Sequence, residues 1–451
     1  MLEIGCGDGE NVIPMAFMLP GSSFAGIDLA ASAIEKGREA ICELDLKNIR
    51  LESADLMDLG AGLGEFDYII AHGFYSWVPA PVRDKLLELV RRCLAPKGVA
   101  FVSYNAYPGC RVREMIREML LFHLRSIQGI GERMRAAREF LNMMLSSRKK
   151  GEDHTDGIKK ELERMLKNGD WTLLHDEAAP VYFPIYFADF MKHAAQHGLQ
   201  YLDEANFFDF QDWRAPAGVA EALASDRIEL EQYRDFLSLR KFHRTLLVHR
   251  ELRVADEAGV GLAVKWHAAS EAVAVSQNPR LDAGYDEEFT SEGTSLKTFN
   301  PLTKAALMCL ISDWPRTIPF DDLRQQCREL TGAESGELEL AEVLVQLYRS
   351  GLAELHTVPR ICASKPGELP STTALARWQA QRGTRVTTVL HTLAHAEGAE
   401  RKLLTLLDGS RNRGQLAAEL RPYAAEVSES QLMGLLEGSL NKLARMGLLV
   451  A

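Results

Sequence analysis

Short apolar runs alternate with amphipathic stretches along the N-terminal part of the chain. The runs have the length of strands and are bounded by turn residues; they cover residues 2–4, 23–28, 49–54, 66–71 and 99–104. Between them, residues 14–19, 31–44 and 81–94 have the character of helices, the last two with apolar residues at helical spacing. Alternating strands and helices predict an α/β fold with a parallel sheet. The continuous run 66–71 is typical of a strand buried on both faces.

The pattern changes after residue 110. Residues 111–148 form a long helical segment rich in Met, Leu and Arg, and the charged stretch 149–157 follows it. Residues 186–197 then predict a helix, and 199–205 and 243–249 predict strands. We interpret these as the last helix and the closing hairpin of the same sheet. Residues 111–180 are therefore predicted to be a helical insertion or lid, and the first domain to span residues 1–252.

The C-terminal part is mostly helical and repeats itself. Residues 253–299 form a turn-rich connecting segment, partly extended at Val264–His267. Beyond it the order of a helix, a second helix and a helix ending in Gly-Leu before a short strand occurs twice, which predicts winged-helix-like units at 300–375 and 376–451. A recognition helix for DNA should be basic, but Glu337–Tyr348 is acidic and Glu429–Leu443 has one lysine. A protein or subunit interface is favoured over nucleic acid.

Composition narrows the class of protein. The chain has 451 residues, enough for two to four domains, and is 46% hydrophobic and 25% charged. Its net charge of -11 argues against coating nucleic acid or an anionic membrane by bulk charge. The seven cysteines are dispersed without a Cys-x-x-Cys pair, so we predict no metal site and no disulfide framework. A cytoplasmic setting fits, and we expect no membrane span.

The first candidate ligand-binding residues lie in the stretch 2–10, where a short strand leads into a glycine-rich turn. Gly5, Gly7 and Gly9 alternate in this turn, so the backbone can approach a ligand closely. Glu3 lies on the strand just before the turn, where its side chain can accept a hydrogen bond from a cationic or hydroxyl-bearing ligand. Glu10 stands where the dinucleotide fingerprint requires Gly or Ala, which argues against NAD.

Two acids follow neighbouring strands at the same sheet edge. Asp28, with Leu29 beside it, ends the second strand at the spacing that presents a carboxylate to ribose hydroxyls. Asp55, with Leu56 beside it, follows the third strand and is placed to accept from the amino group of an adenine. Together with the glycine turn they predict a nucleoside lying across the carboxyl ends of the strands. A domain whose glycines only pack a helix on a strand remains the alternative.

These motifs closely resemble those of class I S-adenosylmethionine-dependent methyltransferases, which implies a Rossmann-like sheet and S-adenosyl-L-methionine as cofactor. Such enzymes normally have one or two helices before the first strand. Because Met1 leads directly into that strand, we expect that the chain is truncated or that its start is misassigned. This affects the retention of the cofactor.

Two further loops follow strands at the sheet edge where the methyl acceptor should enter, at residues 69–79 and 102–109. Their aromatic residues Tyr75, Trp77, Tyr104 and Tyr107 would give faces for a sulfonium and for a lysine stem. His72 or Asn105 would orient the amine, and His72 also adjoins the cofactor. Aromatic residues at strand ends are also often only rim packing, and a lone histidine is more often structural.

With these loops and its long C-terminal half, the chain is similar to the bacterial methyltransferases that carry a methyltransferase regulatory domain. The rickettsial protein lysine methyltransferases belong to that family, so the resemblance implies N-methylation of a lysine side chain in a protein substrate. Cys110 is a departure, since a bulkier aromatic residue is expected there.

Other interpretations remain open. The chain could be a small-molecule methyltransferase with a C-terminal interaction region, or a binding protein without catalysis. His175-Asp176-Glu177 could suggest metal ligands, but adjacent residues on one loop rarely converge, which favours a capping or turn role. The Met-rich helical segment and the tandem units make a homodimer plausible.

Overall fold

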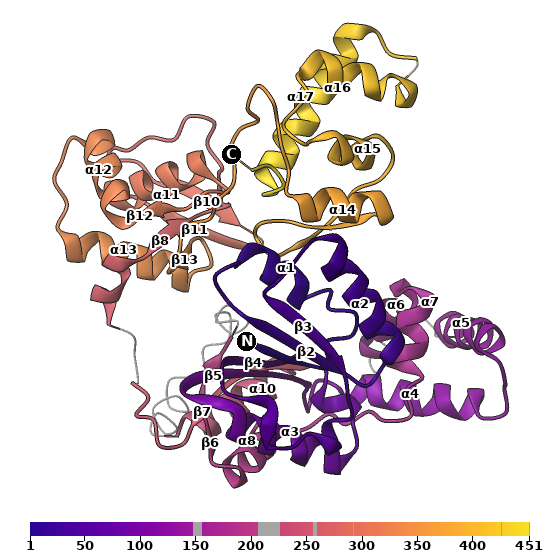
Figure 1. The fold of residues 1–451 in the computed structure, drawn as a ribbon. Coiled ribbons are helices and arrows are strands. Elements are labelled where there is room, and N and C mark those ends of the chain that lie inside the picture. Colours follow the sequence, from indigo (N-terminus) through magenta and orange to yellow (C-terminus); the bar gives the residue numbers. More distant parts are fainter. Residues whose placement is uncertain (148–155, 206–225, 256–258, 292, 425, 451) are drawn as a thin grey trace. The chain divides into compact units, whose positions relative to one another are not determined.

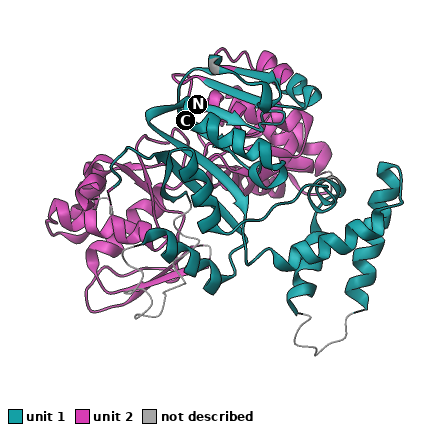
Figure 2. Ribbon diagram, turned by 90° about the horizontal axis from the view of Figure 1, so that it is seen from below, with its two compact units in different colours: residues 1–9, 24–37, 50–254 teal, residues 10–23, 38–49, 255–451 magenta. Residues whose placement is uncertain are grey.

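The computed structural model describes residues 1–147, 156–205, 226–255, 259–291, 293–424 and 426–450 (Figure 1). Most of the charged stretch 149–157 lies outside these ranges. The chain divides into two compact units, residues 1–9, 24–37 and 50–254, and residues 10–23, 38–49 and 255–451 (Figure 2). The second unit therefore includes α1 (Val12–Met18).

A seven-stranded sheet forms the centre of the first unit. Its strand order is β3-β2-β1-β4-β5-β7-β6. The strands are β1 (Leu2–Ile4), β2 (Phe24–Asp28), β3 (Ile49–Ser53), β4 (Phe66–Ala71), β5 (Leu94–Asn105), β6 (Leu199–Glu204) and β7 (Phe242–His249). β1 pairs in parallel with β2 and β4, and β4 pairs in parallel with β5. The α/β sheet predicted from the alternation of apolar runs is confirmed.

The last two strands of this sheet run antiparallel to their neighbours. β7 pairs with β5 over Ala100–Asn105 and with β6 on its other side. The predicted pairing of the last two strands is confirmed, but the two strands do not form a hairpin and α8 (Phe187–Gln196) is not the last helix, because α10 (Arg227–Ser238) lies between β6 and β7 in the chain. β7 lies between β5 and β6. Of the seven strands of this sheet, the one that comes last in the sequence is therefore an interior strand.

The core of the first unit lies between the sheet and its helices. The helices that contribute to this core are α3 (Ala80–Cys93) and α8, and Ile228 of α10 packs against it. The residues of α2 (Ala31–Glu43) are divided between the two units. α3 buries Leu86, Leu87 and Val90, as its spacing predicted. In β4, Ile69 and Ala71 are buried, but Tyr68 is 59% exposed. The expectation of burial on both faces therefore fails for the first half of β4, which lies at the margin of the packed layer.

The helical segment after β5 consists of several short helices. α4 (Arg111–Leu124) and α5 (Ile130–Ser146) are separated by a turn at Gly129, whose φ of 84° a helix cannot contain. They pack with α6 (Asp156–Lys167) and the turns α7 (Asp170–Thr172) and η4 (Leu173–Glu177) around a core of their own. The predicted helical character is confirmed, but a continuous helix over 111–148 is wrong.

Within the second unit, the first C-terminal module joins three helices to a small sheet. The helices are α11 (Pro301–Asp313), α12 (Phe320–Thr331) and α13 (Glu337–Arg349). β8 (His267–Ala269) is the central strand between β12 (Ile318–Pro319) and β13 (Glu354–His356). The expected extended segment at Val264–His267 is instead helical as far as Lys265, in η6 (Val260–Lys265). β9 (Val273–Ala274), β10 (Glu287–Ser291) and β11 (Thr294–Thr298) form a second small sheet.

The second C-terminal module repeats this topology with fewer strand residues. Its helices are α15 (Gly398–Leu406), α16 (Arg413–Leu420) and α17 (Glu429–Arg445). Ser371 bridges Asp408 after α15 and Val450 after α17, just as β8 pairs with the strands that follow α11 and α13. α14 (Ala374–Arg382) and the hairpin of β14 (Arg385–Thr387) and β15 (Leu393–His395) precede α15. The winged-helix-like character is confirmed, while the predicted domain limits stay a prediction.

Among the described residues, no helix combines the length and the apolar character needed to span a membrane.

Candidate active site

The glycine turn between β1 and α1 is held by backbone hydrogen bonds to β2. The amides of Gly5 and Cys6 donate to the carbonyl of Ile27 at 2.8 and 3.2 Å. Gly7 has a φ of 56°, in the left-handed region that favours glycine. A Cβ added to Gly7 would meet no described atom within 4 Å, whereas one on Gly5 would lie 2.6 Å from the ring of Phe74. Gly5 therefore serves internal packing, while Gly7 faces open space in which a ligand can approach the backbone.

Asp28 links the end of β2 to this turn. One carboxylate oxygen accepts from the amide of Gly7 at 2.8 Å, and the other accepts from the amide of Ala30 at 2.8 Å. Each carboxylate oxygen has two lone pairs, so both oxygens retain capacity to accept from ribose hydroxyls.

The remaining predicted cofactor residues lie on neighbouring strands or within three residues of their ends. Glu3 is buried on β1, in register with Gly26 of β2. Leu29 is 71% exposed directly after β2, while Leu56 is buried after β3. Asp55 is exposed and caps a short 3₁₀ turn, since its side chain accepts from the amide of Met57 at 2.9 Å. These acceptor groups and the open glycine turn lie at the carboxyl ends of β1, β2 and β3, an arrangement that suits an adenosyl ligand.

His72 directly follows β4 and contacts β5. Its Nδ1 lies 3.0 Å from the hydroxyl of Ser103, and its ring lies 5.8 Å from that of Phe101. Partial burial of the ring, with a smaller effect of the Arg244 guanidinium, lowers the pKa of His72 below its ordinary value of 6.5. The imidazole is therefore mainly neutral at pH 7, which leaves it able to accept a hydrogen bond.

Trp77 and Asn105 come together with residues that the sequence analysis did not select. The indole of Trp77 lies 5.2 Å from the ring of Tyr182, and Arg113 donates to the side-chain oxygen of Asn105 at 3.3 Å. Arg113 also donates two hydrogen bonds of 3.0 Å to the buried carboxylate of Glu177. The sequence feature that could have drawn attention to this region is the pair of tyrosines, Tyr182 and Tyr186, directly before α8.

Tyr107 lies between the end of β5 and the helical insertion, which begins at Arg111. Its hydroxyl donates to the carboxylate of Glu114 at 2.6 Å, and its ring lies 5.4 Å from that of Tyr186. The guanidinium of Arg111 lies 3.6 Å from the centre of the Tyr107 ring. Burial, followed by the hydrogen bond to Glu114, raises the pKa of Tyr107 above its ordinary value, so this residue presents a neutral phenol.

Tyr75 and Tyr104 are placed differently from the other aromatic candidates. Tyr75 is 1% exposed, and its ring packs against Phe190 of α8 at 5.0 Å. Tyr104 is fully buried and stacks on His243 at 5.3 Å. Both rings belong to the core, so their predicted contact with a lysine or sulfonium finds no support in this geometry and stays a prediction.

The His175-Asp176-Glu177 segment does not gather its three side chains. His175 and Asp176 contact each other, with 3.0 Å between Nδ1 and Oδ1. Glu177 is fully buried and bonds Arg113 and Arg164. The turn role favoured from the sequence agrees with this arrangement.

Three family models match successive parts of the chain. Residues 2–100 match a "Methyltransferase domain", residues 170–249 a "Predicted methyltransferase regulatory domain", and residues 368–432 a "PKMT, C-terminal winged helix domain". Uncharacterized protein RP028 of Rickettsia prowazekii is 33% identical over 203 residues, which cover 45% of this chain and 81% of that protein. The chain belongs to the bacterial class I methyltransferases that carry this regulatory domain.

Further comparisons extend the likeness of this methyltransferase over its whole length. The structure of PKMT2 from Rickettsia typhi in complex with AdoHcy has a TM-score of 0.90 and 25% identity, covering 100% of this chain and 94% of that chain. Uncharacterized protein RP789 of R. prowazekii is 29% identical over 428 residues, 92% of this chain and 77% of that protein. AdoHcy, the ligand in that structure, is the product that S-adenosylmethionine leaves after it has given up its methyl group. Together with the match to a methyltransferase domain, this identifies S-adenosylmethionine as the cofactor of the methyltransferase.

The segment that matches the regulatory model is part of the catalytic sheet in this methyltransferase. Residues 170–249 include α8, β6, α10 and β7, and β7 and β6 complete the seven-stranded sheet beside β5. Residues 2–100 alone contain the glycine turn and both acids but end within β5. The regulatory segment is therefore required to complete the sheet.

Proposed function

We propose that this enzyme is a protein lysine methyltransferase. The observation that carries the proposal is the whole-chain likeness to PKMT2, together with the match to a C-terminal winged helix domain described for PKMT proteins. PKMT abbreviates protein lysine methyltransferase. A likeness that extends through both C-terminal modules favours the same class of acceptor, because these modules lie outside the sheet that holds the cofactor.

The proposed cofactor residues lie around the carboxyl ends of β1 to β4. Asp28 would bind the ribose hydroxyls, Asp55 the adenine amino group, and Glu3 the amino-acid end of the cofactor. Gly5, Gly7 and Gly9 shape the turn, and Leu29, Leu56 and His72 complete the set. S-adenosylmethionine supplies an electrophilic methyl group on a sulfonium. The protein must orient the acceptor nitrogen in line with that methyl group and exclude water.

The proposed acceptor side is formed by the loops after β4 and β5 together with the helical insertion. A lysine has a reference pKa of about 10.4, so its amine must lose a proton before it can attack. Apolar walls and nearby positive charge both favour the neutral amine. Trp77 and Tyr182 offer aromatic faces, and the guanidinium of Arg117 lies 4.3 Å from the centre of the Tyr182 ring. Tyr107 and Asn105 would position the amine.

Incubation of the enzyme with radiolabelled S-adenosylmethionine and a whole-cell protein extract tests this proposal. We expect label in protein, recovered as methyllysine after hydrolysis. Blocking the lysines of the extract by reductive dimethylation beforehand should abolish the label, while an Asp28→Ala enzyme serves as the inactive control. Label only in small solutes would support a small-molecule methyltransferase, and no transfer with bound cofactor would support a binding protein.

A protein acceptor and a cytoplasmic location complete the proposal. All seven cysteines of the chain are free thiols, which supports a reducing compartment. Dimer formation, the absence of nucleic-acid binding and the domain limits given above stay predictions.

A further inference from the structure

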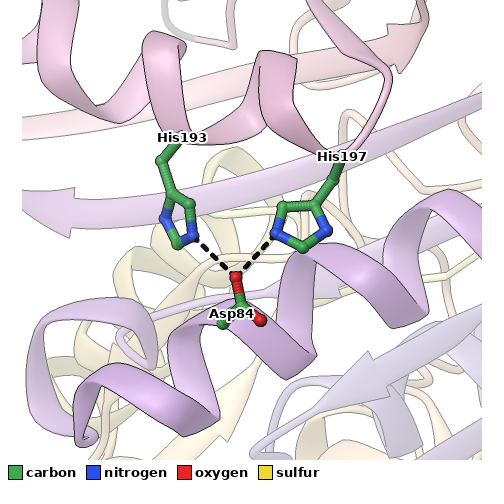
Figure 3. Close-up of side chains that lie close together, drawn as sticks. All are labelled: Asp84, His193 and His197. Carbon is green, nitrogen blue, oxygen red and sulfur yellow. Dashed lines mark hydrogen bonds and ion pairs between the residues drawn. The ribbon is translucent and has the colours of Figure 1, made fainter.

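Two histidines and one aspartate face one another between α3 and α8, and none of the three has a role in the proposed methyl transfer. His193 lies on the last turn of α8, and His197 caps its C-terminal end. The i, i+4 spacing places both imidazoles on one side of the helix. Asp84 projects from α3 toward them, and Figure 3 shows both rings turned toward its carboxylate.

The distances within this cluster suit a metal ion. The Nε2 atoms of His193 and His197 lie 3.3 and 2.9 Å from Oδ1 of Asp84. One potential ligand atom from each residue can be chosen so that all lie within 4.8 Å of one another. In a tetrahedral zinc site, bonds of about 2.0–2.1 Å place neighbouring ligand atoms roughly 3.3 Å apart. Small side-chain rotations would therefore bring the three atoms to bonding distance of one ion.

His193 also has the outer partner that a metal-binding histidine requires. Its Nδ1 lies 2.8 Å from the hydroxyl of Tyr75, which is 1% exposed and held in the core. Metal-binding histidines almost always use their second nitrogen in a hydrogen bond that fixes the ring. The Tyr75 hydroxyl can accept from Nδ1–H, which leaves the lone pair of Nε2 directed toward Asp84.

We propose that Asp84, His193 and His197 bind a divalent transition-metal ion, with Zn²⁺ as the best chemical match. Two imidazoles and one carboxylate are a donor set that Zn²⁺ binds with a fourth position left to water. A groove of about 460 Å³, lined in part by Asp84, His193 and Phe183, gives room for that water. The bound ion links α3 to α8 and, through His193 and Tyr75, to the loop after β4.

The same three side chains also form a consistent arrangement without metal. Both imidazoles can donate Nε2–H to Oδ1 of Asp84, while Tyr75 donates to Nδ1 of His193. Hydrogen-bonded Asp–His clusters of this kind are the alternative that an experiment must distinguish. Metal binding and this network use the same nitrogens, so only a direct measurement of the ion separates them.

Calorimetric titration of tag-free, chelator-treated protein with Zn²⁺ is the direct test. The titration uses a Cys42→Ser background, because Cys42 is exposed and thiolates bind Zn²⁺. We expect one ion per chain, with binding lost in His197→Gln and strongly weakened in Asp84→Asn. Asp84 is 65% exposed, so its substitution leaves folding intact. Tyr75→Phe should weaken binding by about 10-fold, the lower end of outer-partner effects.

The matched control is His175→Gln, because His175 is an exposed histidine on another segment. This variant should bind Zn²⁺ like the parent protein. Co²⁺ in place of Zn²⁺ should give the visible absorption of a tetrahedral nitrogen and oxygen site in the parent but not in His197→Gln. Lack of a Zn²⁺ site in the parent, or equal binding in the parent and in folded Asp84→Asn and His197→Gln, would overturn the proposal. These readouts do not depend on methyl transfer.

Discussion

The carboxylate of Asp28 and the backbone amide of Gly7 are joined by a hydrogen bond of 2.8 Å. The same carboxylate that we assign to the ribose hydroxyls therefore also supports the glycine turn that the cofactor approaches. A charge-assisted bond of this type is stronger than one between neutral groups. Loss of Asp28 should loosen the turn and, if the proposed ribose role holds, also remove a ligand contact.

Asp28→Ala should abolish cofactor binding. Calorimetric titration with S-adenosylhomocysteine measures this directly, and Asp67→Ala serves as the control because Asp67 is an exposed acid near the start of β4. The control should bind like the parent protein. Unchanged affinity in Asp28→Ala would rule out the ribose role.

Tyr107→Ala should slow turnover more than it weakens cofactor binding. The ring of Tyr107 contacts Tyr186 and Arg111 beyond the end of β5, on the proposed acceptor side. Steady-state kinetics with the protein acceptor and a cofactor titration measure the two effects separately. Tyr107→Phe keeps the ring and loses only the bond to Glu114, so it should retain more turnover. Equal losses of turnover and cofactor affinity in Tyr107→Ala would contradict an acceptor role.

Glu177→Gln should destabilise the first unit. Glu177 is fully buried and bonds both Arg113 and Arg164. Breaking a buried ion pair by removing one partner typically costs about 3–5 kcal/mol, because the remaining charge is buried without compensation. Urea unfolding measures the loss, and Glu118→Gln on the exposed face of α4 should change stability little. Similar stabilities for the two variants would show that the buried guanidiniums find other partners.

His243 should make the stability of the sheet depend on pH. The ring is fully buried; burial opposes its charge, but hydrogen bonds to Asp235 and Glu204 outweigh this and raise the pKa of His243 above 6.5. A pKa raised in the folded state adds stability that is fully present below the unfolded value and is lost as pH rises through the folded value. The stability difference between the parent and His243→Gln should therefore be larger at about pH 6 than at about pH 9 in urea unfolding. A difference that is constant with pH would mean that the ring stays neutral.

Much of the cofactor side could be predicted from sequence because its residues are local. Asp28 ends β2, Asp55 lies two residues after the end of β3, and the glycine turn follows β1 within a few residues. A strand end fixes the sheet edge at which a side chain appears. Short-range patterning therefore placed the predicted cofactor residues at one edge, although their individual roles stay predictions.

The acceptor side was less predictable because its contacts join distant parts of the chain. Arg113 and Glu177 are 64 residues apart, and no periodic pattern relates them. Tyr75 belongs to a loop at the correct edge, but the 3₁₀ turn Tyr75–Trp77 buries its ring against α8. Position in a loop does not determine the direction of a side chain. The break at Gly129 was missed because the apolar spacing continues on both sides of it.

In the two C-terminal modules, the short strands could not be predicted from the sequence. The helices of the modules repeat in the sequence, but β12 has two residues and the corresponding pairing in the second module is the single bridge between Ser371 and Asp408. A strand that short has no alternation for a sequence pattern to detect. The shared topology became visible only through backbone pairing.

The interior position of β7 has a consequence for synthesis on the ribosome. β5 and β6 emerge first. β5 can pair with β4 on one side, but its other edge and β6 lack their shared neighbour β7 until residues 242–249 have left the exit tunnel. Until then the nascent chain presents an open strand edge, a template for intermolecular association. Expression fragments that stop after β5 should therefore aggregate, and the shortest soluble catalytic fragment must extend through His249.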